Sequence, residues 1–372
     1  MPADGLGAWR GGRFALTSLV DHLSGQLTLG IDFREAGVSE IFEDHPYLYH
    51  YTDFGGLKGI LETQTIWATH YKALNDFSEV EHMRSVLENW TLKIVNAVMR
   101  QKAKQRFKYR RRFEKHGGLA ATSRLVAKEL VDRFYQVTFG SSGVLDPFAE
   151  PYVVSFCAHT HDSDYVKKNG LLSQWRAYGD DGGFALVFDT KRLCTCLETE
   201  WKTYEYSAFY LADVVYDNQE EKFEAEFGDL SGALEQFIHA EAEGAENPPA
   251  GGVLQPFFNA VTRFKHRGFE EENEVRLTAS PIPESVYRRV EEEREEGDSP
   301  LKAIKTVHSR EKHGNQAAYI ILNDLPKKKR LPIIRIIVGS QRDQRQRARE
   351  VLKLIGNKRI GIVCSETPFI PV

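Results

Sequence analysis

The sequence predicts an α+β fold, with mixed or antiparallel sheets and a helical insertion. Short stretches rich in aromatic and β-branched residues, such as YVVSFC, are typical of strands. These stretches come in runs, and helical segments are inserted between the runs rather than in strict alternation, which favours α+β over a doubly wound parallel sheet. The sequence also contains no GxGxxG or P-loop pattern.

The composition is that of an ordinary globular protein. The chain has 372 residues, of which 41% are hydrophobic and 27% charged, enough for one large domain or two ordinary ones. No apolar run approaches the roughly 18 residues that cross a bilayer, and the N-terminus lacks the basic-then-apolar pattern of a signal peptide. We therefore expect a cytoplasmic protein without a membrane partner.

The N-terminal part predicts an arm and then the first elements of a fold. Residues 1–45 are glycine-rich and then weakly patterned, so we expect a weakly structured arm there and a single domain over 46–372. LYHYT predicts the first strand and TIWAT the second. Between them, Leu57, Ile60 and Leu61 have the i, i+3, i+4 spacing of a short helix.

A helical insertion is expected at about 80–140. The tetrapeptide Ser78-Glu79-Val80-Glu81 has the form of a capping box that opens a long helix. A second helix is expected from Ser123 to about Val137. The first helix keeps one face apolar, at Val80, Met83, Leu87, Trp90, Ile94 and Val98.

From Pro151 onward strands dominate the prediction. Helices are expected in the acidic stretch at 219–245 and from Arg345 to Leu354. Strands are expected for YVVSFC, GGFALVFDT, ADVVY, ENEVRLTASP, AAYIILND, LPIIRIIVGS and RIGIVCSE.

His50, between two tyrosines on the first predicted strand, is the first candidate for a functional residue. It can face a cleft and bind a polar ligand, or it can be a hydrogen-bonded core residue. The helix that follows begins near Asp53 to Gly56, where free backbone N–H groups suit an anion.

The segment from Ser173 to Gly183 is the second candidate. It holds Trp175, Arg176 and Tyr178 just before a glycine-rich turn into a strand. Loops with such residues bind planar or charged ligands. The other interpretation is a hairpin entry with a buried tryptophan anchor.

The third candidate is the pair of carboxylates in ENEVRL. Alternation along a strand would place Glu272, Glu274 and Arg276 on one face, with the two carboxylates roughly 7 Å apart. Such a pair can serve one substrate. A solvated face with Glu–Arg ion pairs is the alternative.

The segment from Arg100 to Lys115 is a candidate partner surface. Nine of its sixteen residues are basic, and Phe107, Tyr109 and Phe113 lie among them. Basic residues interleaved with aromatics suit nucleic acid. The alternative is a solvated helix paired with the acidic stretches at 219–226 and 291–296.

No metal is expected. Cys157, His159, His161 and Asp162 are close in sequence but do not have a standard zinc spacing. Cys194-x-Cys196 is equally uncharacteristic. None of the four cysteines forms a CxxC pair, so no disulfide framework is indicated either.

Together these pieces resemble a widespread bacterial family known as a domain of unknown function, over roughly residues 47–370. The motifs that carry the resemblance are LYHYT, GIL, IWAT, LND with Glu79, SFC, Trp175, Tyr178-Gly179, ENEVRL from Glu272 to Leu277, and Ser365 to Pro368.

The order of these motifs is also distantly similar to the ADP-ribosyltransferase fold. That resemblance matches His50, Ser155 and Glu272-x-Glu274 to its three motifs, although the middle motif here is Ser-Phe-Cys rather than Ser-Thr-Ser. It implies NAD as a substrate and no metal. Glu274 would hydrogen-bond the ribose 2′-OH and favour an oxocarbenium-like transition state, and Glu272 would orient the acceptor.

The remaining implied contacts are with the dinucleotide. His50 would hold the adenosine side, and Trp175 or Tyr178 would stack on nicotinamide. The other residues implied at the NAD site are Tyr51, Thr52, Ser155 and Arg176.

The function expected from this resemblance is that of a NAD-consuming ADP-ribosyltransferase or NAD glycohydrolase, of the kind that acts as a toxin or defence effector. The alternative is a non-enzymatic module with a degenerate pocket that binds nucleic acid or protein.

Overall fold

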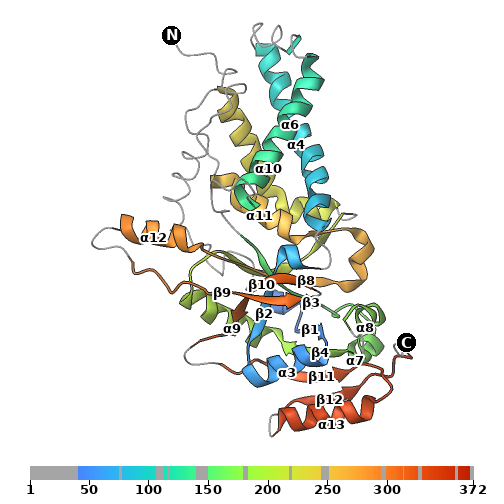
Figure 1. Cartoon of the computed structure of the whole chain (residues 1–372). Helices are drawn as coiled ribbons and strands as arrows, with labels where there is room; N and C mark the ends of the chain where they lie inside the picture. The colour runs from blue at the N-terminus through green and yellow to red at the C-terminus, as the bar shows by residue number, and fades with distance from the viewer. Residues whose placement is uncertain are drawn as a thin grey trace.

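The computed structural model confirms an α+β fold with a mixed sheet (Figure 1). It describes residues 41–74, 78–105, 113–114, 117–139, 150–178, 183–217, 220–243, 251–294, 299–312, 314–325, 329–356 and 359–368. Residues 1–40 of the predicted arm lie outside the described residues, as do residues 106–112 and 115 of the basic segment from Arg100 to Lys115.

The first elements match the predicted pattern. After α2 (Ile41–Asp44) come β1 (Tyr47–Thr52), α3 (Phe54–Thr63), β2 (Ile66–His70) and the short 3₁₀ helix η1 (Tyr71–Ala73). The buried face of α3 consists of the three predicted residues, Leu57, Ile60 and Leu61.

Close packing at the start of α3 explains one of its glycines, Gly56. Asp53 caps the helix, because its Oδ1 accepts a hydrogen bond of 2.6 Å from the backbone N–H of Gly56. A Cβ at Gly56 would lie 2.1 Å from Thr52 Oγ1, whereas a Cβ at Gly59 would meet no atom within 4 Å. Gly56 therefore lets the chain turn tightly from β1 into α3.

The main sheet has the strand order β12-β11-β4-β1-β3-β2-β10-β9, and β8 joins it through β3 and carries β5. Its pairs are antiparallel except for β11 with β12. A separate parallel pair is formed by β6 (Val215–Tyr216) and β7 (Phe264–Lys265). The remaining strands are β3 (Tyr152–Cys157), β4 (Phe184–Asp189), β5 (Tyr206–Asp213), β8 (Glu274–Pro281), β9 (Val307–Lys312), β10 (Asn315–Leu322), β11 (Ile333–Val338) and β12 (Gly361–Cys364).

The sheet divides along one edge of β3. On its other edge, β3 pairs with β8 over its whole length. On the dividing edge, β2 pairs with Tyr152 and Val153, and β1 pairs with Cys157 alone. Neither ladder on this edge includes Ser155. The sheet is thus two half-sheets, β12-β11-β4-β1 and β9-β10-β2-β3-β8-β5, which part from one another at Ser155.

The helical insertion is confirmed. It consists of α4 (Ser78–Gln105) and α6 (Gly118–Phe139), which pack against each other, and the described residues of this span contain no strand. Two helices from later in the chain, α10 (Glu220–Glu243) and α11 (Gly251–Arg263), join them. Figure 1 shows all four on one side of the sheet. Aromatic contacts such as Phe134 with Phe237 and Phe257 tie the four together.

Two predicted boundaries were wrong. The stretch GGFALVFDT leaves the strand at Asp189, because Asp189 Oδ1 accepts from the Arg192 N–H and caps α9 (Thr190–Thr203). Residues expected in a loop form α8 (Leu172–Tyr178), which follows α7 (Asp164–Asn169).

The last helices are α12 (Glu284–Glu293) and α13 (Gln344–Ile355). Within the described residues, no helix combines the length and apolar character that a membrane span requires.

Candidate functional site

His50 occupies the division between the half-sheets. Its Nδ1 donates a hydrogen bond of 3.0 Å to the carbonyl oxygen of Ser155, which the neighbouring strand ladders leave out. Its ring packs against Phe156, with centroids 5.7 Å apart. Burial lowers the pKa of His50, and the hydrogen bond to the Ser155 carbonyl only partly offsets this effect. The imidazole is therefore neutral at pH 7, with Nε2 as its acceptor atom.

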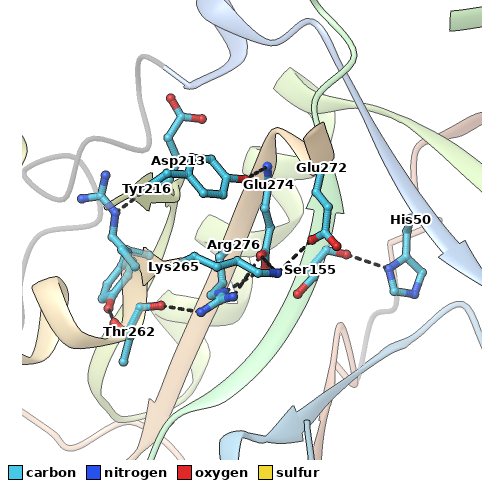
Figure 2. Close-up of polar contacts among 11 residues, drawn as sticks. His50, Ser155, Asp213, Tyr216, Thr262, Lys265, Glu272, Glu274 and Arg276 are labelled. Carbon is cyan, nitrogen blue, oxygen red and sulfur yellow. Dashed lines mark hydrogen bonds and ion pairs between the residues drawn. The ribbon is translucent and has the colours of Figure 1, made fainter. Parts of the chain in front are cut away.

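Glu274 lies on the other side of Ser155 (Figure 2). The β3–β8 register places the side chain of Ser155 on the same face as Glu274, where it helps to lower the pKa of the carboxyl group. Arg276 holds the same carboxylate with a two-pronged contact, from Nε to Oε1 at 2.8 Å and from Nη2 to Oε2 at 2.9 Å. A second cation, the Nζ of Lys265, lies 3.0 Å from Oε2.

This environment keeps the buried Glu274 ionised. Burial raises the pKa of its carboxyl group, but the charges of Arg276 and Lys265 and the hydrogen bonds from Arg276 and Ser155 outweigh burial and lower the pKa to about 2. Only 3% of the residue is exposed. Glu274 is thus a buried carboxylate that carries its charge throughout the physiological pH range.

Glu272 is not on the predicted strand. It ends the 3₁₀ helix η2 (Arg267–Glu272), and Asn273 follows in the left-handed conformation with φ of 42°, so the alternation assumed from the sequence begins only at Glu274. The two carboxylates nevertheless converge, because Lys265 Nζ lies 2.8 Å from Glu272 Oε2 as well as 3.0 Å from Glu274. The two carboxylates are therefore brought together by their shared contact with Lys265 and not by a common strand face.

The helical bundle and the small parallel sheet hold the cluster in place. Arg276 Nη1 donates to the Thr262 carbonyl in α11 at 2.9 Å, and the Glu274 N–H donates to the Tyr216 hydroxyl in β6 at 3.0 Å. Arg263 Nε donates to the Asp213 carbonyl at 2.9 Å and so fixes the end of α11 beside β5. These contacts are drawn in Figure 2.

The hydrogen-bonding capacity of Glu274 is fully used. A carboxylate offers about four lone-pair sites. Arg276 occupies two and Lys265 occupies one, and the Ser155 side chain, which also lowers the pKa of Glu274, is the remaining donor on this face. Ser155 is half-buried, and a hydroxyl rotates easily. A ligand hydroxyl can therefore reach Glu274 most simply by replacing the Ser155 hydroxyl.

Trp175 is a structural anchor in this structure. Only 2% of it is exposed, its Nε1 donates to the Asn169 carbonyl at 3.1 Å, and its ring meets Tyr51 edge-on at 4.9 Å. Gly170 has φ of 76° and packs so closely that a Cβ there would lie 2.3 Å from the indole. Stacking on nicotinamide would require the indole to leave this place, so Trp175 is not part of the site built here.

Tyr51 is also buried and internally bonded. Its hydroxyl accepts from the Leu171 N–H at 2.9 Å and lies 2.8 Å from His159 Nε2, while His159 Nδ1 lies 2.6 Å from Asp162 Oδ2. Tyr51 thus connects β1 to His159 and to the loop between α7 and α8. Among the described residues, no group of three or more His, Cys, Asp or Glu side chains is placed to hold a metal ion.

Three further candidates lie near the surface. Thr52 is half-buried and faces Gly56, and Arg176 is exposed. Tyr178 is 42% exposed. Burial, followed by the charges of Glu272 and Glu274, raises the pKa of Tyr178 to about 12, which places its hydroxyl within the field of the carboxylates.

Lys265 is the residue of the site that sequence reasoning missed. It lies in a strand of two residues directly after α11, a helix that contains Pro256 and follows a glycine- and proline-rich stretch. Such a stretch is typical of a loop, and nothing in the sequence near Lys265 indicates a partner nine residues later.

Comparison with known proteins finds a match to one family, and the description of that family names no activity. Residues 174–277 match the model of a family described as "Protein of unknown function (DUF2971)". The match covers Trp175, Lys265 and the segment from Glu272 to Leu277, and it confirms the expected resemblance to a family of unknown function. No curated protein and no solved structure matches the chain.

Proposed function

Because the matched family is described by no activity, we propose a function from the site itself: the protein cleaves the nicotinamide–ribose bond of NAD, as an ADP-ribosyltransferase or a NAD glycohydrolase. The main observation in support of this proposal is that His50 and Glu274 both lie against Ser155, at the point where the two half-sheets part. A ligand that enters there meets a neutral imidazole and an ionised carboxylate.

The proposed chemistry needs a fixed negative charge. When the bond between C1′ of the ribose and the nicotinamide nitrogen breaks, the bonding electrons leave with neutral nicotinamide and the ribose becomes oxocarbenium-like. Water then attacks C1′ and loses a proton to give ADP-ribose, or an acceptor group attacks and loses its own proton. A preorganised carboxylate stabilises this cation more in the transition state than in the ground state.

Glu274 meets this need in two respects. Its low pKa keeps it charged at neutral pH, and the contacts with Arg276 and Lys265 fix its orientation before substrate arrives. The ribose 2′-OH would replace the Ser155 hydroxyl as the fourth donor to Glu274. Glu272, whose side chain is 21% exposed, would orient the attacking group.

One observation favours the alternative of a non-enzymatic binding module. Glu272, Glu274, Lys265 and Arg276 form a set of ion pairs with no net formal charge. A purely structural role is enough to explain such a set: its ion pairs neutralise buried charges between the helical bundle and β8. In that case the protein would bind nucleic acid or protein without turning over NAD.

A nicotinamide-release assay with the full chain separates the two functions. The enzyme interpretation predicts release of nicotinamide in proportion to ADP-ribose, with or without transfer to an added acceptor. The binding-module interpretation predicts neither release nor calorimetric NAD binding at millimolar NAD, and that result would end the enzyme proposal.

A further inference from the structure

A stack of aromatic rings crosses the outer strands of one half-sheet. Trp67 of β2 stacks on Tyr319 of β10, with centroids 4.5 Å apart and planes at 26°. Tyr319 stacks in turn on His308 of β9, at 5.4 Å and 28°. The strand registers place all three side chains on the same face of the sheet. We call Trp67, Tyr319 and His308 the ring ladder.

Arg310 lies over the ring ladder, and no carboxylate among the described residues pairs with it. Its guanidinium carbon is 5.1 Å from the centroid of Trp67 and 5.6 Å from that of Tyr319. Within the described part of the chain its contacts are these rings and a 3.4 Å hydrogen bond to Thr69 Oγ1, and its buried Nε has no hydrogen-bond partner. An arginine with unused donors over a ring system suits a phosphate beside a stacked base.

The face that carries the ring ladder is partly exposed, and none of its described side chains is acidic. Trp67 is 42% exposed. The acidic residue of β9, Glu311, occupies the alternate position and therefore belongs to the opposite face. None of the other described side chains that share the face on these strands is acidic, namely Thr69, Asn315, Ala317 and Ile321. The surface is complementary to an anion that also carries aromatic groups.

The ring ladder begins beside the candidate site and leads away from it. The β2–β3 ladder ends at the pair of Thr69 with Val153. Trp67 lies two residues beyond Thr69 on β2, and Ser155 lies two residues beyond Val153 on β3, so both follow directly after the end of the ladder. From there the rings lead to β9, the last strand in the order of that half-sheet. A binding surface that runs from the division between the two half-sheets to the edge of the sheet suits a polymer better than a dinucleotide.

We propose that the ring ladder and Arg310 bind single-stranded nucleic acid. One unpaired base extends the stack on the outer face of Trp67, and Arg310 contacts a neighbouring phosphate. Duplex bases are already stacked on one another and do not offer a free face. If the proposed NAD cleavage holds, the bound strand is delivered toward Ser155 as the acceptor; the binding itself does not depend on that reaction.

Fluorescence anisotropy with labelled 20-mers of thymidine or uridine tests the binding, with the full chain and no NAD. Loss of one base–aromatic stack in Trp67→Leu should weaken binding about 5- to 150-fold. Trp67→Phe keeps a ring and should restore most of the affinity. Arg310→Ala should weaken binding, whereas Arg349→Ala, which removes the same charge from an exposed position on α13, should not.

Several outcomes would overturn the proposal. These are the absence of single-strand binding at low salt, equal affinity of wild type and Trp67→Leu, or equal loss in Arg310→Ala and Arg349→Ala. If Trp67→Leu weakened NAD binding and spared oligonucleotide binding, the ring ladder would serve the dinucleotide instead. Thermal melting of each variant shows whether it is folded. Because no NAD is present, failure of this proposal and failure of NAD cleavage are separate results.

Discussion

His50 and Glu274 meet at a single residue: the carbonyl of Ser155 accepts from His50 Nδ1 at 3.0 Å, and the side chain of Ser155 lies on the same strand face as Glu274 and helps to lower its pKa. The contact exists because the ladders of β1 and β2 both stop short of Ser155 on the same edge of β3. A backbone group that a sheet would normally satisfy is thus satisfied by a side chain, and the charged carboxylate lies directly behind it.

The first prediction concerns protonation of His50. Its pKa in the folded protein is lowered, so the stability that neutral His50 provides is complete above the unfolded value of about 6.5 and is lost as pH falls below it. His50→Gln keeps a donor for the Ser155 carbonyl but does not titrate. In urea unfolding, the wild type should lose more free energy of unfolding than His50→Gln between pH 7.5 and pH 5.5. Parallel losses would show that folding does not lower the pKa of His50.

The second prediction compares two glycines of α3. Gly56→Ala places a methyl group against Thr52 and should lower the free energy of unfolding by about 1–3 kcal/mol. Gly59→Ala meets open space in the same helix and should raise it by about 0.5–1 kcal/mol. Chemical denaturation of both variants measures the difference. A Gly56→Ala variant as stable as Gly59→Ala would mean that the turn from β1 into α3 is not tightly packed.

The third prediction concerns Trp175. Because Trp175 is a buried anchor, the Trp175→Phe variant should be about 2 kcal/mol less stable than wild type. The substitution removes a hydrogen bond and leaves a void. Trp90→Phe, at a half-buried position on α4, is the control and should cost less. NAD affinity should change little in either variant. Weaker NAD binding by Trp175→Phe at unchanged stability would instead indicate that the indole stacks on the ligand.

Local patterns in the sequence account for much of the fold. β1, α3 and β2 are predicted because their periodicity and capping residues are contained in short windows, and Leu57, Ile60 and Leu61 are buried as that spacing requires. The residue types at His50 and Glu274 also point to a site.

The arrangement of the site could not be predicted in the same way. The division at Ser155 depends on which strands pair with β3, and a strand sequence does not state its partners. Glu272 was placed on a strand face because alternation was extended through Asn273, which is left-handed in the structure. Lys265 reaches its carboxylates through the packing of α11 on β8, a long-range contact with no local signal.

Glu274→Gln tests the central claim most directly, by nicotinamide release with NAD affinity measured separately by calorimetry. The amide keeps the size of the side chain and loses the charge, which the oxocarbenium-like state needs far more than bound NAD does. Turnover should fall about 10²- to 10³-fold while NAD affinity changes little. Glu226→Gln, which removes a carboxylate paired with Arg263 outside the site, is the matched control and should keep wild-type turnover. Equal turnover by wild type and a folded Glu274→Gln variant would contradict the account.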